Sequence, residues 1–264
     1  MSFFDGVLYS KTLEIDTRLG VILPQDSRNA RVDAPAGKNT GFKTPKTLIL
    51  LHGLSDNAAA WWMRTSIIRY AEAHGIAVLM PQGEKSFYHD MVYGERYFTY
   101  LTEELPQLAG EMFGLSTAPD DLMIAGLSMG GYGALKCALT YPERYFACAA
   151  FSSACDIAAM ADNAGVIEQA KGVHQTFEAI FGVPVRVPEE SDLFLLSSRN
   201  AGKLGRLQLY MACGQQDFLY ESNVRLAGHL REKNLKRFLY EEWDGTHEWG
   251  FWDKAIRRTL DWIE

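Results

Sequence analysis

The stretch DDLMIAGLSMGGYGALKCALTYPERY, residues 120–145, decides the fold. A short apolar run, Leu122–Ala125, leads into Gly126-Leu-Ser128-Met-Gly130, and a segment with helical spacing follows. This strand, turn and helix are the context that a G-x-S-x-G nucleophile elbow requires. Such a turn lifts the serine hydroxyl to the carboxyl edge of a sheet, where open α/β sheets place their ligands. A dinucleotide-binding loop needs G-x-G-x-x-G, a spacing that GLSMGGYG does not provide.

Apolar runs and amphipathic segments alternate along the rest of the chain, and residues 8–23 alternate weakly enough for an opening hairpin. The apolar runs predict strands at 47–51, 76–80, 122–125, 146–151, 207–212 and 238–240. The amphipathic segments predict helices at 57–74, 97–112, 130–141, 221–232 and 248–263. This alternation predicts an α/β fold, with a mostly parallel central sheet and helices on both faces.

The length of 264 residues fits a single domain over residues 1–264. Residues 24–46 are polar and rich in Gly and Pro, which predicts a surface connection. Residues 156–200 separate two predicted strands and are too many for a simple crossover. We therefore expect residues 156–200 to form a small helical lid insertion.

Composition and charge exclude several classes of function. The net charge is −7, from 26 basic and 33 acidic residues, so the basic surface that nucleic-acid binding needs is missing. Neither a secretory signal nor a membrane span is visible, so no membrane partner is expected. Cys137, Cys148, Cys155 and Cys213 lack the spacing of a metal site, so no metal is expected. These features favour a reduced, cytoplasmic protein.

A nucleophilic serine needs a base and an acid that orients the base, and both lie later in the chain in this type of fold. Asp217 follows the predicted strand 207–212, and His247 follows the predicted strand 238–240. We therefore predict a catalytic triad of Ser128, Asp217 and His247. His89 is a competing base, and two acidic residues compete with Asp217, namely Glu221 and Asp244.

The negative charge of a tetrahedral intermediate requires hydrogen-bond donors near the serine. The backbone N–H of Met129 follows the nucleophile, and the loop after strand 47–51 supplies the second donor. Leu54 is the expected residue in that loop. His52 ends the strand, and we expect it to support the loop rather than to move protons.

Aromatic residues lie near the predicted mouth of the site. They suggest a small apolar pocket with polar tips, although most aromatic side chains pack into cores and helix interfaces. Trp61, Tyr88 and Trp249 are the predicted substrate-binding residues.

Four segments together carry a resemblance to a known family: HGLSDNAAAW (52–61), GLSMGGYGAL (126–135), GQQDFLY (214–220) and DGTHEW (244–249). This set resembles the α/β-hydrolase esterases of the tributyrin esterase and esterase D group, to which S-formylglutathione hydrolases also belong. The similarity extends from about residue 45 to the end of the chain. It implies an α/β-hydrolase fold and a serine carboxylesterase that cleaves short acyl esters, from acetyl to butyryl, without a cofactor. It also implies the roles given above to Ser128, Asp217, His247, Leu54 and Met129.

One departure from the family pattern concerns the loop after the strand at 47–51. S-formylglutathione hydrolases typically carry an HGLTC-type loop with a cysteine, and this chain reads HGLSDN. The glutathione-thioester activity is therefore an alternative rather than the first choice. An acyltransferase or a catalytically silent binding module on the same fold are further alternatives. The expected partner is a small-molecule ester, and self-assembly into a homo-oligomer is left open.

Overall fold

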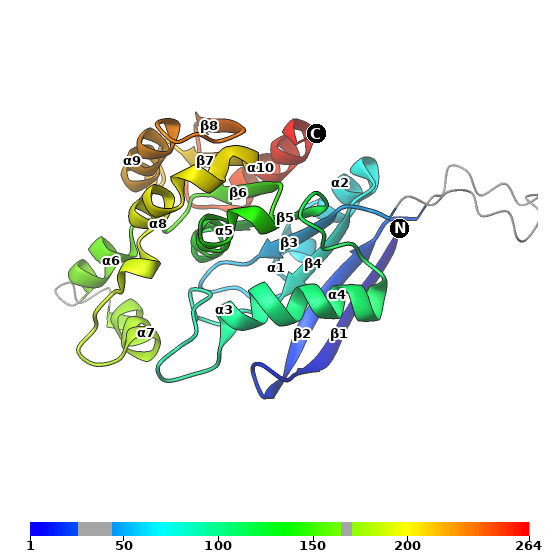
Figure 1. Ribbon diagram of the computed structural model, residues 1–264, viewed down its shortest axis with the longest axis horizontal. Coiled ribbons are helices and arrows are strands. Elements are labelled where there is room, and N and C mark those ends of the chain that lie inside the picture. The colour runs from blue at the N-terminus through cyan, green and yellow to red at the C-terminus, as the bar shows by residue number, and fades with distance from the viewer. Residues whose placement is uncertain (26–43, 165–170, 264) are drawn as a thin grey trace, which may run out of the picture.

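An eight-stranded sheet runs through the described residues, 1–25, 44–164 and 171–263, of this computed structural model (Figure 1). The strands lie in the order β1-β2-β4-β3-β5-β6-β7-β8. All pairings from β4 to β8 are parallel, and β2 pairs antiparallel with both β1 and β4. The strands are β1 (Ser2–Ser10), β2 (Ile15–Leu23), β3 (Thr47–Leu51), β4 (Ala77–Pro81), β5 (Leu122–Leu127), β6 (Ala147–Phe151), β7 (Gln208–Gly214) and β8 (Arg237–Trp243). The predicted mostly parallel sheet is confirmed.

Burial on both faces explains the continuous apolar runs of the central strands. Every residue of β3 is buried, and successive side chains point to opposite faces. Ile49 and Leu51 pack into one hydrophobic core, whereas Leu48 and Leu50 pack into the other. The opening hairpin is longer than predicted, because the exposed edge strand β1 pairs with β2 from Ser2 onward.

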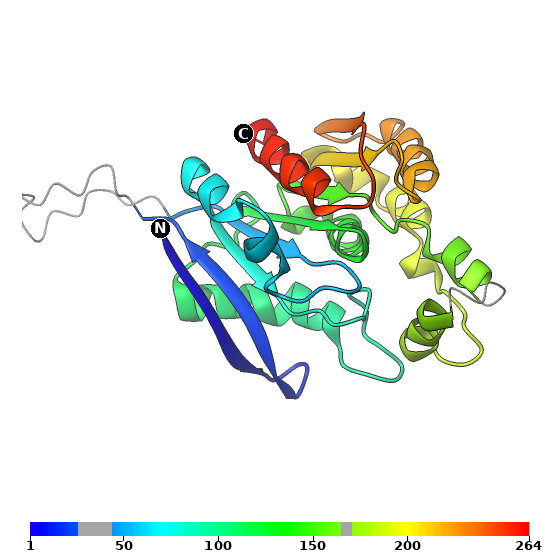
Figure 2. The same cartoon turned by 180° about the vertical axis from the view of Figure 1, so that it is seen from behind.

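Helices cover both faces of the sheet, as the alternation predicted (Figures 1 and 2). Residues of α4, α5, α7, α8 and α9 pack into one core, and residues of α1, α2 and α10 pack into the other. The α-helices are α1 (Ala60–Arg64), α2 (Ile67–His74), α3 (Tyr97–Thr99), α4 (Leu105–Phe113), α5 (Met129–Thr140), α6 (Ile157–Ala164), α7 (Lys171–Phe181), α8 (Leu193–Arg199), α9 (Tyr220–Arg231) and α10 (Trp249–Trp262). Tighter or wider turns are the π-helical η1 (Tyr100–Glu104) and the 3₁₀ helices η2 (Pro142–Arg144), η4 (Glu189–Ser191) and η5 (Ala201–Arg206). In the described part of the chain, no helix is both long and apolar enough to cross a membrane.

The single helix predicted at 57–74 is wrong, because the structure has two helices there, α1 and α2, with non-helical residues between them. Thr65 is extended, with φ −134° and ψ 175°. Its hydroxyl donates to the carbonyl of Trp61 (2.6 Å) and accepts from the N–H of Ile67 (3.2 Å). A threonine side chain that bonds to the nearby backbone competes with the helical ladder, which accounts for the interruption.

The insertion predicted at 156–200 contains α6, α7, η4 and α8, although residues 165–170 lie outside the described residues. The predicted connection at 24–46 likewise falls mostly outside them. The end of α7 packs against the loop between β4 and α3 (Figure 1). There Val92 N–H donates to Ile180 O (3.0 Å) and Tyr93 N–H to Ala179 O (2.9 Å). Part of the insertion is thus anchored to that loop.

Candidate active site

Ser128 occupies a strained turn between β5 and α5. Its φ of 53° and ψ of −117° lie where non-glycine residues are rarely found. Such a conformation costs on the order of 1–3 kcal/mol and persists only when the surroundings enforce it. Two hydrogen bonds do so: Ser128 N–H donates to Phe151 O (2.8 Å), and Ala154 N–H donates to Ser128 O (3.1 Å). The turn therefore has the geometry of a nucleophile elbow.

Two glycines allow the strand and the helix to approach on either side of this serine. A Cβ on Gly126 would lie 2.3 Å from the carbonyl oxygen of Gly130. A Cβ on Gly130 would lie 2.5 Å from the carbonyl oxygen of Leu51. Both contacts are with backbone, which cannot move aside cheaply, so the spacing G-x-S-x-G is a requirement of packing.

The structure brings Ser128, His247 and Asp217 together from loops at the ends of three strands. The distance between His247 Nε2 and Ser128 Oγ is 3.0 Å, and that between His247 Nδ1 and Asp217 Oδ2 is 2.9 Å. An ionised carboxylate can only accept, so His247 Nδ1–H donates to Asp217 and Nε2 accepts from the serine hydroxyl. The Asp217 side chain is fully buried and that of His247 is 22% exposed, so the acid is enclosed while the base faces the site.

Asp217 is held in its charged form despite its burial. Desolvation raises the pKa of this carboxyl, but hydrogen bonds from His247 and from the backbone N–H of Leu219 (2.9 Å) outweigh it and lower the pKa below 3.8. A negative charge is therefore maintained behind the imidazole.

The competing residues from the sequence lie elsewhere. Asp244 Oδ1 faces the side-chain amide of Gln216 (3.4 Å). Glu221, in the first turn of α9, lines a separate cavity of about 220 Å³. His89 contacts Tyr132 and Lys136 instead of the serine. Within the described residues, no group of three or more His, Cys, Asp or Glu side chains is placed to hold a metal ion.

The loops that carry the acid and the base are fastened to each other. Gln216 N–H donates to Gly245 O (3.1 Å), and Gly245 N–H donates to the Gln216 side-chain oxygen (2.8 Å). A Cβ on Gly214 would lie 2.2 Å from Gly245 O, so the contact tolerates only glycine there. Asp217 and His247 thus sit on one interlocked pair of loops.

The loop after β3 lies directly against the nucleophile. A Cβ on Gly53 would be 3.7 Å from Ser128 Cβ and 2.7 Å from the Leu127 side chain. The next residue, Leu54, is half-buried beside it. Met129 is the first residue of α5, so its N–H has no carbonyl to bond within the helix. These are the two residues predicted to bind the oxyanion, and that role stays a prediction.

His52 supports this loop, in line with the expectation that it does not move protons. Gly83 N–H donates to His52 Nε2 (2.9 Å), so Nδ1 carries the hydrogen and faces Gly53 O (2.8 Å). Burial lowers the pKa of His52 to about 4, which keeps the ring neutral.

Two of the three predicted substrate-binding residues are corrected by the structure. Trp61 is 0% exposed, and its indole N–H donates to Leu51 O (2.9 Å). Tyr88 is 1% exposed, and its hydroxyl donates to His52 O (3.0 Å). Both rings are enclosed and brace the backbone at the end of β3, so they offer almost no surface to a substrate. Trp249 is half-buried, and its role in binding stays a prediction.

Two further aromatic side chains lie against His247: Phe218, one of the aromatic residues expected near the mouth of the site, and Trp252, which the sequence did not single out. Phe218 is 75% exposed, and its ring centre is 4.6 Å from that of His247. Trp252 stands edge-on to the same imidazole at 4.9 Å, and its indole N–H donates to Ser152 Oγ (3.1 Å). Trp252 lies one turn into the last helix, so its closeness to the base depended on loop geometry that no local pattern encodes.

The chain is similar to known esterases and serine hydrolases over nearly its whole length. The chain is 32% identical over 258 residues to an acetyl esterase of Caldicellulosiruptor saccharolyticus, a match that covers 97% of this chain and 95% of that protein. It superposes on FphF, a fluorophosphonate-binding serine hydrolase of Staphylococcus aureus, with a TM-score of 0.83 and 33% identity, covering 99% and 97% of the two chains. For the S-formylglutathione hydrolase FrmB of Staphylococcus aureus the TM-score is 0.80 at 33% identity, covering 99% and 98%.

The same similarities fix the class of enzyme. The chain has the α/β-hydrolase fold and is a carboxylic ester hydrolase of the serine type. The family described as Putative esterase matches residues 10–263, nearly the whole chain. The protein belongs to this esterase family.

Proposed function

We propose that this protein is a serine carboxylesterase that hydrolyses short-chain esters, acetyl to butyryl, through Ser128, His247 and Asp217. The observation that carries the proposal is the continuous hydrogen-bonded chain from Ser128 Oγ through His247 to the buried Asp217 carboxylate. The preference for short acyl groups rests on the similarity to an acetyl esterase and to the tributyrin esterase pattern.

The reaction proceeds in two acyl-transfer steps. His247 Nε2 takes the hydroxyl proton as Ser128 Oγ attacks the ester carbonyl carbon. Asp217 keeps the imidazole in the required tautomer and stabilises the imidazolium. The N–H groups of Leu54 and Met129 bind the oxyanion, after which His247 protonates the departing alcohol. Water then attacks the acyl-enzyme with the same base, releasing the carboxylic acid and free serine.

Burst kinetics with p-nitrophenyl acetate, butyrate and octanoate test the proposal. The wild-type protein should turn over acetate and butyrate faster than octanoate. Ser128→Ala should lose about 10⁶-fold in kcat, the scale of removing a triad serine. Ser198→Ala, which alters an exposed serine, is the matched control and should keep wild-type activity. Substantial turnover by Ser128→Ala would show that another group is the nucleophile.

A second candidate activity is hydrolysis of the thioester S-formylglutathione. The specific observation in its favour is the 33% identity and full-length superposition with FrmB. The same triad can attack an ester or a thioester carbonyl, so the two activities differ in the binding of the leaving group. A kcat/KM for S-formylglutathione well above that for p-nitrophenyl acetate would make the thioester the better substrate. Product analysis with added alcohols would reveal acyl transfer, and silence toward all these substrates in folded protein would favour a binding module.

We also propose that the protein acts in the cytoplasm. All four of its cysteines are buried and free, as expected for a reducing compartment.

A further inference from the structure

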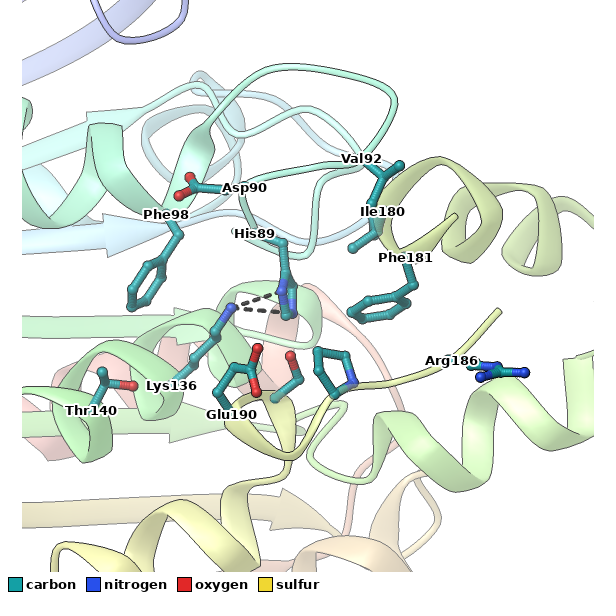
Figure 3. Close-up of a pocket in the computed structure, with 12 residues that line it drawn as sticks. His89, Asp90, Val92, Phe98, Lys136, Thr140, Ile180, Phe181, Arg186 and Glu190 are labelled. Carbon is teal, nitrogen blue, oxygen red and sulfur yellow. Dashed lines mark hydrogen bonds between the residues drawn. The ribbon is translucent and has the colours of Figure 1, made fainter. Parts of the chain in front are cut away.

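A cavity of about 410 Å³ lies beside α5, and Ser128, His247 and Asp217 are not among the residues that line it (Figure 3). Its walls come from the β4–α3 loop, α5, α7 and the segment that leads into α8. The volume falls within the range of small-molecule pockets, roughly 300–1,000 Å³. The proposed esterase reaction makes no use of this space.

Lys136 is the buried charge of the cavity. The residue is only 5% exposed, and its Nζ lies 2.7 Å from His89 Nδ1 and 4.4 Å from the ring centre of Phe98. Among the described residues, no carboxylate forms an ion pair with it. Burial lowers the pKa of Lys136 to about 7, because an ammonium is costly to keep away from water and the carboxylates of Asp90 and Glu190 offset that cost only in part.

His89 cannot supply a counter-charge. Tyr132 gives its only hydroxyl hydrogen to Ser191 O (2.8 Å), so it accepts from His89 Nε2–H at 3.0 Å. The other ring nitrogen, Nδ1, is then a neutral acceptor for one N–H of Lys136. The remaining hydrogens of the lysine lack an anionic partner.

Two buried hydroxyls add to this unsatisfied polarity. Ser191 Oγ and Thr140 Oγ1 both belong to residues that line the cavity. In the part of the chain that the structure describes, neither oxygen has a hydrogen-bond partner. Ser191 is 1% exposed, so its hydroxyl has no bulk water to replace the missing partner. A buried polar atom without a partner is costly and calls for an explanation such as a bound molecule.

The remaining walls define the kind of molecule that fits. Apolar side chains flank the His89–Lys136 pair, with Phe98 on one side and Ile180 and Phe181 on the other (Figure 3). The carboxylate of Asp90 is already engaged, since it accepts from Thr99 N–H (2.9 Å) and the Thr99 hydroxyl (2.7 Å). Lys136 is buried whereas Arg186, the other cation of the lining, is exposed, so a ligand with one negative charge next to hydrocarbon fits these walls.

We propose that this cavity binds a small organic monocarboxylate. Its carboxylate pairs with Lys136 Nζ and accepts from the Ser191 and Thr140 hydroxyls, and its hydrocarbon part lies against Ile180 and Phe181. Glu190, an exposed residue that also lines the cavity, lies near the lysine and competes with the ligand for its charge.

Isothermal titration calorimetry with sodium hexanoate and sodium benzoate tests the proposal. All proteins carry Ser128→Ala, so that any binding of the carboxylates at the triad is the same in every variant and the differences report on the cavity. Lys136→Met should weaken binding at least tenfold, because it removes the cation while keeping a side chain of similar length. Glu190→Gln should tighten binding, because it removes a competing negative charge. Lys203→Met, which removes an exposed lysine, should leave the affinity unchanged.

Three results would overturn the proposal. One is undiminished affinity in Lys136→Met, and another is the absence of binding to either carboxylate at millimolar concentrations. The third is tighter binding of inorganic phosphate than of both carboxylates, since that would indicate a site for a compact polyanion. If Lys136→Met fails to fold, Glu190→Gln still tests the proposal, because Glu190 is exposed. Weaker or equal binding in that variant would contradict a ligand carboxylate that competes with Glu190 for Lys136.

Discussion

Two histidines of this protein lie near α5 but have opposite surroundings. His247 stands between the Ser128 hydroxyl and the buried carboxylate of Asp217, with part of its ring open to the site. His89 stands between the Tyr132 hydroxyl and the ammonium of Lys136, with 5% of the residue exposed. Each imidazole contacts one hydroxyl and one charged group, but the two differ in the sign of that charge and in exposure.

The difference shows that burial and the charged partner together decide what a histidine can do. A carboxylate behind the ring stabilises the imidazolium that forms when a base takes up a proton. Burial, and to a lesser degree the nearby lysine, lower the pKa of His89 far below its usual range of about 6.5. His89 is therefore a fixed hydrogen-bonding group, whereas His247 is equipped to act as the base.

Replacement of each histidine in turn tests this contrast, and the variant at His247 has the largest expected effect on kcat. His247→Ala should reduce kcat for p-nitrophenyl acetate by about 10⁶-fold, the scale found when the base of a triad is removed. His89→Gln keeps a hydrogen-bonding side chain and should change kcat less than tenfold. Steady-state kinetics on both variants make the measurement, after circular dichroism has shown that each is folded. Similar losses in the two variants would contradict the contrast.

Replacement of the acidic residues near His247 has the next largest expected effect on kcat. Asp217→Asn should lower kcat by about 10⁴-fold, because an amide facing Nδ1 favours the wrong imidazole tautomer. Asp244→Asn, three residues before the base, is the matched control and should lose less than threefold. A larger loss of kcat in Asp244→Asn than in Asp217→Asn would show that Asp244 is the orienting acid.

The smallest effect concerns the pH dependence of stability at Lys136. Its pKa falls from 10.5 to about 7 on folding, so between these values the unfolded chain binds a proton that the folded chain does not. Stability from this group therefore rises as pH increases from 7 toward 10.5. Lys136→Met should remove up to about 1.4 kcal/mol per pH unit from the slope of the unfolding free energy.

Urea denaturation between pH 7.5 and 9.5 measures that slope. Lys203→Met provides the control for loss of a lysine that is exposed in the folded protein. An unchanged slope in Lys136→Met would mean that the lysine keeps its proton in the folded state, which would contradict the lowered pKa of Lys136.

Much of the fold could be predicted because its signals are local. Strands buried on both faces have to be continuous apolar runs, and β5 followed by Gly126, Ser128 and Gly130 satisfies a packing requirement that the sequence displays openly. The break at Thr65 was missed because it depends on one hydroxyl that bonds to the backbone on both sides.

The site was only partly predictable because the choice among its candidate residues depends on three-dimensional contacts between loops. The sequence offered Asp217, Glu221 and Asp244 as acids in nearby loops, and the turn after β7 decides which one reaches His247. Trp61 and Tyr88 were expected to touch substrate because they are aromatic and near the predicted mouth of the site. Their polar atoms instead bond to backbone carbonyls inside the protein, a contact that composition cannot reveal.

The interlocked loops at Gly214 and Gly245 have a consequence for how the site forms. Since two hydrogen bonds join Gln216 and Gly245, the loops that carry Asp217 and His247 are held against each other as soon as the chain has folded. The orienting of the base is thus completed before an ester arrives, and little reorganisation remains for the reaction itself. Anyone transplanting this acid–base pair onto another parallel sheet would have to move both loops together, glycines included.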